Sequence, residues 1–131
     1  MPVSLVATLV ATILGFVLGA LWYGPLFGKP WMAAAGVSRG QMMAGFNPAK
    51  TYGITFVLGF IAAWMFGLYV GEHPGFRFSV ALGAGIGIFW VATSLATNYL
   101  FEGRSARLIL INGGYHAVRF VLTGIAFALL G

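Results

Sequence analysis

Residues 3–23 of the chain read VSLVATLVATILGFVLGALWY. The stretch contains no charged residue, and its length matches the ~20 residues with which a helix crosses the hydrocarbon core of a bilayer. No Lys or Arg precedes it, no A-x-A-like cleavage site follows it, and its apolar run exceeds that of a signal peptide. We therefore predict a retained membrane-spanning helix over 3–23, ended by Gly24-Pro25.

Three further stretches have the same length and apolar character, and we predict helices over 48–70, 78–100 and 106–130. Asn47 is expected to cap the second helix, with Pro48 at its first position. The sequence His73-Pro74-Gly75 turns the chain into the third helix. Ser105 is expected to cap the fourth.

The composition excludes a soluble fold. Of 131 residues, 60% are hydrophobic and only 7% are charged, against about 25% charged in soluble domains. The apolar stretches show none of the alternation of a membrane β-barrel. We predict an all-α polytopic membrane protein, in which one domain over residues 1–131 forms an antiparallel bundle of four transmembrane helices.

The only long connection, 24–47, is too interrupted by Gly and Pro to span the membrane. We favour a short helix lying at the membrane interface, with Trp22 and Trp31 as anchors at headgroup depth. A plain surface loop is the alternative.

Charge predicts the orientation. Five basic residues fall in or beside the first and third connections: Lys29, Arg39, Lys50, Arg104 and Arg107. The opposite side has only Arg77. Since cytoplasmic loops carry the excess of Lys and Arg, both termini are expected outside. The same excess favours contact with anionic lipid, and no interleaved basic and aromatic run indicates nucleic acid.

Small residues repeat at four-residue spacing. Ala7, Ala11, Gly15 and Gly19 follow one another along the first helix, and Gly83 and Gly87 repeat the spacing in the third. Such seams allow close helix packing, either within the chain or between copies. We expect a homo-oligomer that uses the seam of the first helix. A weak similarity between 26–29 and 100–104 also allows two hairpins related as a parallel repeat.

The fourth helix carries the clearest polar pattern. Asn112, Tyr115, His116, Arg119 and Thr123 recur at spacings of three and four, so they share one helix face. We call these five residues the polar stripe. We expect the stripe to face the bundle interior and the apolar face with Gly114 and Ala117 to meet lipid. Ser94, Thr97 and Asn98 of the third helix form a second polar row, which is expected to meet the stripe.

Arg119 needs a partner, because a charge within the membrane costs at least ~2.5 kcal/mol on insertion scales. Glu72 and Glu102 are possible ion-pair partners, and a bound anion is another. The functional interpretation places Asn112, Tyr115, His116, Arg119, Asn98, Ser94 and Thr97 along a solute or ion pathway. The structural interpretation makes the hydroxyl and amide groups interhelical hydrogen bonds and lets Arg119 extend to the outer headgroups.

Enzyme chemistry finds little support. The chain has no Asp and no Cys, and its two Glu residues are expected at opposite membrane faces. A paired acid and base and a Ser-His-Asp set are therefore excluded. His73 and His116 lie at different depths, so no metal site is predicted, and no cofactor is expected.

Two segments carry a family resemblance. Residues 21–32, LWYGPLFGKPWM, resemble the first-helix signature of a bacterial membrane family called domain of unknown function 1761. Residues 98–104, NYLFEGR, and 110–116, LINGGYH, resemble its C-terminal signature. Gly24 departs from the serine expected there in many relatives. The resemblance implies a small inner-membrane protein of four helices, and it implies no activity, substrate or cofactor.

Two classes of function remain open at this point. The first is a small transporter or channel for a polar or anionic solute, with a polar pathway on the third and fourth helices. The second is a non-catalytic scaffold, partner-binding or lipid-binding module. A solute cavity beside Asn112, His116 and Arg119 would favour the first class, and a dry bundle would favour the second.

Overall fold

The computed structural model describes residues 3–131, and in this range the chain is helical and contains no strand. The helices are α1 (Leu5–Leu21), α2 (Gly28–Ala35), α3 (Arg39–Met43), α4 (Pro48–Val70), α5 (Phe76–Gly85), α6 (Thr93–Phe101) and α7 (Ala106–Leu130). A π-helical segment, Trp22–Leu26, continues α1, and a second, Ile86–Ala92, joins α5 to α6.

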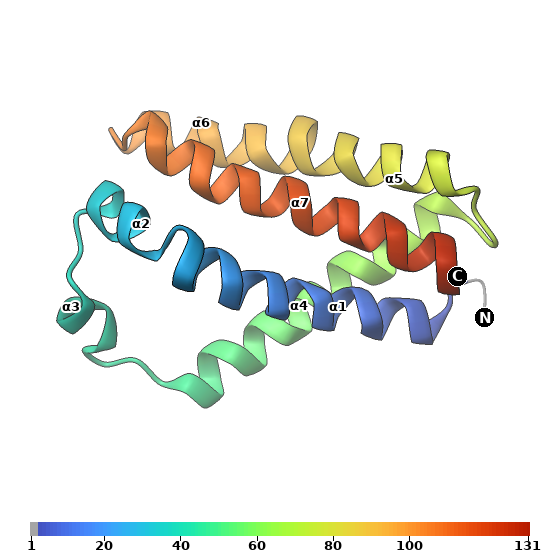
Figure 1. Cartoon of the computed structure of the whole chain (residues 1–131), viewed down its shortest axis with the longest axis horizontal. Helices are drawn as coiled ribbons and strands as arrows, with labels where there is room; N and C mark the ends of the chain where they lie inside the picture. The colour runs from blue at the N-terminus through green and yellow to red at the C-terminus, as the bar shows by residue number, and fades with distance from the viewer. Residues whose placement is uncertain (1–2) are drawn as a thin grey trace.

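Four continuous helices are long and apolar enough to cross a membrane: Leu5–Leu26, Pro48–Val70, Phe76–Phe101 and Ala106–Leu130. They confirm the four helices predicted from the sequence (Figure 1). The mean hydropathy falls from 2.3 in the first to 1.4 in the last. The last helix is therefore the most polar of the four, and more of its surface has to be shielded from lipid by the other helices.

The predicted caps are present. The Asn47 side chain accepts a hydrogen bond from the amide of Lys50 at 3.2 Å, and Pro48 occupies the first helical turn. The Ser105 hydroxyl accepts one from the amide of Leu108 at 3.3 Å. Each cap binds an amide that lacks a partner within its own helix.

The prediction that Gly24-Pro25 ends the first helix is wrong. The chain passes through Pro25 as a π-helical turn, in which the Phe27 amide donates to the Trp22 carbonyl at 2.7 Å. Proline removes a backbone donor and crowds the preceding turn, and a π turn accommodates both. The helix therefore reaches Leu26 before the chain bends at Phe27.

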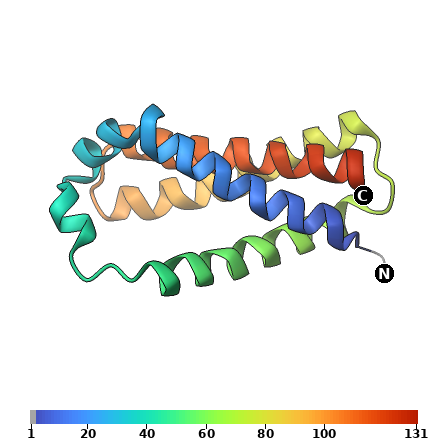
Figure 2. The same ribbon diagram turned by 60° about the horizontal axis from the view of Figure 1, so that its bottom comes forward.

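The segment 24–47 contains two short helices, α2 and α3, so the plain loop is excluded. Ser38 begins α3 with a reciprocal capping box, in which its hydroxyl accepts from the Gln41 amide and the Gln41 side chain accepts from the Ser38 amide. Both helices lie at the end of the molecule opposite the chain termini (Figures 1 and 2).

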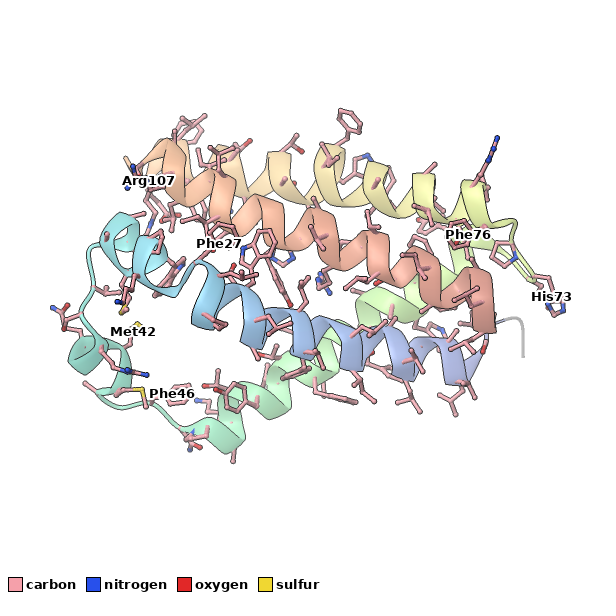
Figure 3. The ribbon with its side chains drawn as sticks, in the orientation of Figure 1. Phe27, Met42, Phe46, His73, Phe76 and Arg107 are labelled. Carbon is pink, nitrogen blue, oxygen red and sulfur yellow. The ribbon has the colours of Figure 1, made fainter. Side chains whose placement is uncertain are left out.

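The two ends of the molecule differ in charge. At the end near both termini, the Ser4 hydroxyl donates to the Leu130 carbonyl, and a His73 ring nitrogen lies 3.0 Å from the Gly131 carbonyl oxygen. Arg107 lies at the opposite end, together with α2 and α3 (Figure 3). Five basic residues belong to that end or to the segments beside it, as the sequence analysis expected.

Helix α7 is the central element, since it packs against α1, α2, α5, α6 and the second π-helical segment. The expected lipid-facing side of this helix is therefore covered. The Trp22 ring lies against Gly114, and the backbone of Gly87 lies against Ala117. Gly83 brings the backbone of α5 equally close to the carbonyl of Phe120. The apolar face of α7 thus meets protein rather than lipid.

The buried core lies toward the terminal end, where Val3, Ala7, Phe66 and Phe127 are each at most 2% exposed. The small-residue seam of α1 is buried within the same chain. Ala7 and Ala11 belong to the core, and Gly15 and Gly19 lie against Arg119 and Tyr115. The first three residues of the seam are therefore buried against the rest of the chain, and Gly19 is half-buried.

The first half of α4 stands clear of the bundle. Every residue from 48 to 58 is exposed, while Ala63, Phe66 and Val70 of the second half are buried. Figures 1 and 2 show α4 separating from α1 toward α3. The gap between α1 and α4 is the place where the candidate site lies.

Candidate functional site

A cavity of about 950 Å³ lies between α1, α4 and α7, and we call it the Arg119 cavity. Its volume is at the upper end of the range for small-molecule pockets. Its walls are formed by Ala11, Thr12, Gly15, Phe16, Gly19, Ala20, Tyr23 and Gly24 from the first helix, Thr51, Tyr52, Thr55, Leu58, Gly59 and Ala63 from α4, and Tyr115, His116, Arg119 and Thr123 from α7.

Arg119 is the only charged residue in the wall of this cavity. Its aliphatic stem packs against Gly15, and the guanidinium carbon lies 4.3 Å from the ring centre of Phe120. Its buried Nε has no hydrogen-bond partner within residues 3–131. The neighbouring His116 has a buried Nδ1 in the same situation. Two unpartnered nitrogen atoms thus lie on adjacent turns of one helix.

Most of the hydroxyl groups around the cavity are hydrogen-bonded within the protein, and those of Thr51 and Tyr52 on α4 are the exceptions among the described residues. Thr12 donates to the Thr8 carbonyl, Thr55 to the Thr51 carbonyl and Thr123 to the Arg119 carbonyl, at 2.6–3.0 Å. Tyr115 donates to the Gly15 carbonyl at 2.8 Å. These four hydroxyls have no proton left for a ligand. On α7, Arg119 and His116 are therefore the polar side chains of the cavity wall that remain to meet one.

A hydrogen-bonded row crosses three helices at the end of the cavity nearest to α2. The Tyr23 hydroxyl donates to Asn112 Oδ1 at 2.6 Å, and Asn112 Nδ2 donates to the Tyr99 hydroxyl at 2.9 Å. The Tyr23 ring also packs against Tyr115, with centroids 5.4 Å apart, and against Trp31 at 6.2 Å. The row fixes Tyr23 at the boundary of the cavity.

A second cavity of about 680 Å³ lies beyond this row, beneath α2 and α3, and we call it the vestibule. It contains two basic residues, Lys29 and Arg39. Its other wall residues are Tyr23, Gly24, Gly28, Trp31, Met32, Met42, Leu95, Tyr99, Asn112 and His116. Tyr23, Gly24 and His116 belong to both cavities, so they form the partition between them.

The polar row of the third predicted helix does not meet the stripe. Ser94, Thr97 and Asn98 are exposed, and none of them borders either cavity. Ser94 donates to the Trp90 carbonyl and Thr97 to the Thr93 carbonyl of their own helix. Serine and threonine readily form such bonds to the preceding turn. The stripe instead faces α1 and α4.

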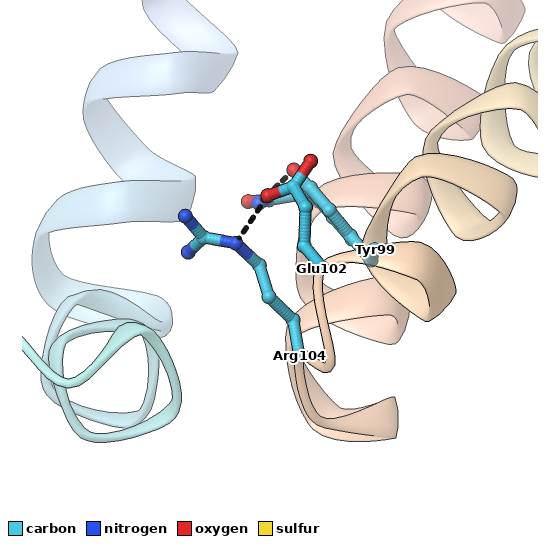
Figure 4. Close-up of polar contacts among 4 residues, drawn as sticks. Tyr99, Glu102 and Arg104 are labelled. Carbon is cyan, nitrogen blue, oxygen red and sulfur yellow. Dashed lines mark hydrogen bonds and ion pairs between the residues drawn. The ribbon is translucent and has the colours of Figure 1, made fainter.

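The expected carboxylate partners of Arg119 are also elsewhere. Glu102 pairs with Arg104, with Nε and Oε1 2.7 Å apart, and Arg104 lies near the Tyr99 ring (Figure 4). Glu72 lies at the terminal end beside His73. Among the described residues, therefore, Arg119 has no acidic partner.

Trp22, predicted as an interfacial anchor, packs within the bundle at the end of the first membrane-length helix. Its indole nitrogen donates to the Ile111 carbonyl at 2.9 Å, and its ring packs against Gly114 and Phe27. These contacts hold the end of the first helix against α7. Trp31 is half-buried and lies in the wall of the vestibule.

The sequence analysis missed Tyr23 and the hydroxyl residues of α4. A usable pattern was present, because Tyr23 follows Ala11, Gly15 and Gly19 at the same four-residue spacing and so shares their face. The small residues leave the space into which Tyr115 and Arg119 extend. The small-residue seam of α1 and the polar stripe of α7 therefore form two walls of the Arg119 cavity.

We expect Tyr23→Phe to lower the stability of the protein by about 1–3 kcal/mol, because it leaves the half-buried Asn112 Oδ1 without its donor. The ring contacts of Tyr23 are kept in this variant. The measurement is thermal unfolding in nanodiscs. Tyr69→Phe is the matched control, since Tyr69 is 64% exposed. An unchanged midpoint for Tyr23→Phe would show that the row contributes nothing to stability.

Comparison with known proteins gives one match. The family model described as protein of unknown function DUF1761 matches residues 6–128, which include both cavities. No curated protein and no solved structure matches the chain. The match covers nearly all of the chain and agrees with the resemblance seen in residues 21–32 and 98–116. The chain is a member of the DUF1761 family, whose function is unknown.

Proposed function

We propose that this membrane protein binds an anionic solute in the Arg119 cavity and carries it across the membrane. The observation that carries the proposal is the guanidinium of Arg119, which borders a large cavity without an acidic partner among the described residues. Such a charge is stabilised when an anion or water occupies the cavity. His116 lies in the same wall and supplies a second polar side chain. The proposal involves no catalytic step.

The cavity favours a carrier over an open channel. At its terminal end it stops at Ala11 and Ala63, which belong to the closed core with Phe66 and Phe127. At its other end it is separated from the vestibule only by Tyr23, Gly24 and His116. A channel needs a continuous path, whereas a carrier is open to one side at a time.

Lys29 and Arg39 of the vestibule support entry of an anion from the α2–α3 end. Clefts lined by one sign of charge raise the local concentration of oppositely charged solutes. We infer an antiparallel bundle in the inner membrane of a bacterium, with this basic end in the cytoplasm and membrane lipids around the exposed apolar faces.

The orientation is tested with C-terminal fusions. Because five basic residues accompany the α2–α3 end and one accompanies the other, both termini are expected outside the cytoplasm. A C-terminal alkaline phosphatase is expected to be active, and a C-terminal fluorescent protein is expected to be dark. The reverse pattern would overturn the assignment.

Transport is tested with a single cysteine in a chain that has none. Gly59 is suitable, since it borders the cavity and a Cβ there makes an ordinary 3.5 Å contact with Thr12. In sealed vesicles of both orientations, a carrier exposes Gly59→Cys to an impermeant thiol reagent from either side. Labelling from the α2–α3 side alone would contradict transport and support a binding module. The cysteine-free parent gives the background.

A further inference from the structure

Resting on the proposed anion site, we propose that the ligand is an amphipathic organic anion that enters sideways from the membrane between α1 and α4. Its acidic head would bind at Arg119 and His116, and its hydrocarbon tail would lie along the apolar wall. Three features of the cavity support this class of ligand: its opening, its lining and the position of its charge.

The opening lies on the flank of the bundle. The α4 wall residues Thr51, Tyr52, Thr55 and Leu58 are exposed, with Tyr52 at 56% and Leu58 at 61%. They lie within the membrane-length helix Pro48–Val70, on the exposed half, where the contact with α1 includes the Phe16 ring packed against Tyr52 and Phe56. The surroundings of such a surface are acyl chains. A ligand that already resides in the membrane therefore has a lateral route to the cavity, in addition to the route through the vestibule.

The lining suits a hydrocarbon tail. Ala11, Gly15, Gly19, Ala20 and Gly59 present small apolar surfaces, and Phe16 and Leu58 present large ones. The hydroxyls of Thr12 and Thr55 have donated to backbone carbonyls. The α1 wall extends from residue 11 to residue 24, about 20 Å at the rise of an α-helix. A compact hydrated anion would leave most of this wall without a partner.

The charge lies deep in the cavity rather than at its rim. Arg119 packs on Gly15, one turn from Thr12 and two turns from Tyr23. Both arginine and histidine present N–H groups suited to a carboxylate or phosphate. A carboxylate and a phosphate monoester share this chemistry. A head bound here leaves its tail along the apolar wall that includes Phe16 and Leu58.

The test is a series of straight-chain carboxylates from acetate to octanoate, bound to the protein in nanodiscs and followed by calorimetry. Empty nanodiscs correct for partition into lipid. We expect affinity to rise about fourfold per methylene buried in the cavity. Arg119→Leu should remove this binding for every chain length. Leu58→Ser, at an exposed wall position, should weaken octanoate while leaving acetate unchanged.

The outcomes separate the two proposals. If acetate and inorganic phosphate bind as tightly as octanoate and depend on Arg119, the ligand is a compact anion; the amphipathic class is then wrong and the anion site stands. If neither the carboxylates of the series nor inorganic phosphate and octyl phosphate bind above the empty-nanodisc background, the anion site itself fails. If octyl phosphate binds with the same Arg119 dependence and octanoate does not, the head is a phosphate and the amphipathic class is upheld.

Discussion

Arg119→Leu is expected to remove the electrostatic preference of the cavity and to raise the stability of the protein at the same time. The preference is measured at Gly59→Cys as the ratio of the labelling rates by an anionic and a cationic thiol reagent, each normalised to its rate with a free thiol. An unpartnered positive charge at this depth should favour the anionic reagent by roughly tenfold. Without Arg119, the ratio should fall to about one.

The gain in stability has a separate cause. Arg119 has no acidic partner among the described residues, and its Nε has no hydrogen bond. Replacing a buried charged group by a hydrophobic one of similar size stabilises proteins by about 1–4 kcal/mol. Thermal unfolding in nanodiscs measures this gain. An unfolding temperature that stays the same or falls would show that the charge of Arg119 costs the protein no stability.

Two further variants complete the test. Arg119→Lys retains the charge but loses the planar fork of donors, so the rate ratio should be kept while carboxylate affinity falls. Arg77→Leu removes an arginine at the terminal end of the molecule, outside the cavity wall. This control should change neither the ratio of labelling rates nor the carboxylate affinity. If Arg119→Leu raises the unfolding temperature and leaves the rate ratio unchanged, Arg119 is a packing residue whose charge reaches the headgroups, and the anion site is disproved.

Gly83→Ala is expected to destabilise the protein more than any other conservative change in the α5–α7 interface. A Cβ at Gly83 would overlap the carbonyl of Phe120 in α7, and a backbone carbonyl cannot rotate away as a side chain does. Overpacking of this kind costs about 1–3 kcal/mol or more. The expected result is a fall of several degrees in the unfolding temperature in nanodiscs.

The same helix provides the matched control. Gly85 lies two residues further along α5 and has open space where its Cβ would be. Because glycine within a helix is less stable than alanine by about 0.5–1 kcal/mol, Gly85→Ala should unfold at the same temperature as the parent or slightly above it. Equal losses for both variants would mean that helix propensity, not the contact with Phe120, governs this interface.

The helices were predictable because their boundaries depend on local chemistry. The Asn47-Pro48 pair and Ser105 each satisfy an amide within three residues, so sequence alone identified them. Pro25 was misjudged for the opposite reason. The chain passes through it as a π turn, beside which the indole of Trp22 is bound to the Ile111 carbonyl of α7, 89 residues away in the chain.

The α7 side of the candidate site was also predictable from local sequence. Helical period places Asn112, Tyr115, His116 and Arg119 on one face, but it does not identify the helix opposite. Ser94 and Thr97 looked like partners, yet their hydroxyls are bound within their own helix. The wall of α1 opposite the stripe consists mainly of small residues. In a sequence, small residues indicate close packing or open space but do not indicate which polar groups they face.

The central position of α7 has a consequence for biogenesis. The chain leaves the ribosome from its N-terminus, so α1, α4 and the α5–α6 helix enter the membrane before α7 does. Until then, the glycine face of α1 and the close-packing glycines of α5 have no partner helix. The last of the four membrane-length helices brings Arg119 and joins α1 to α5. The proposed anion site is therefore completed only by the final insertion step.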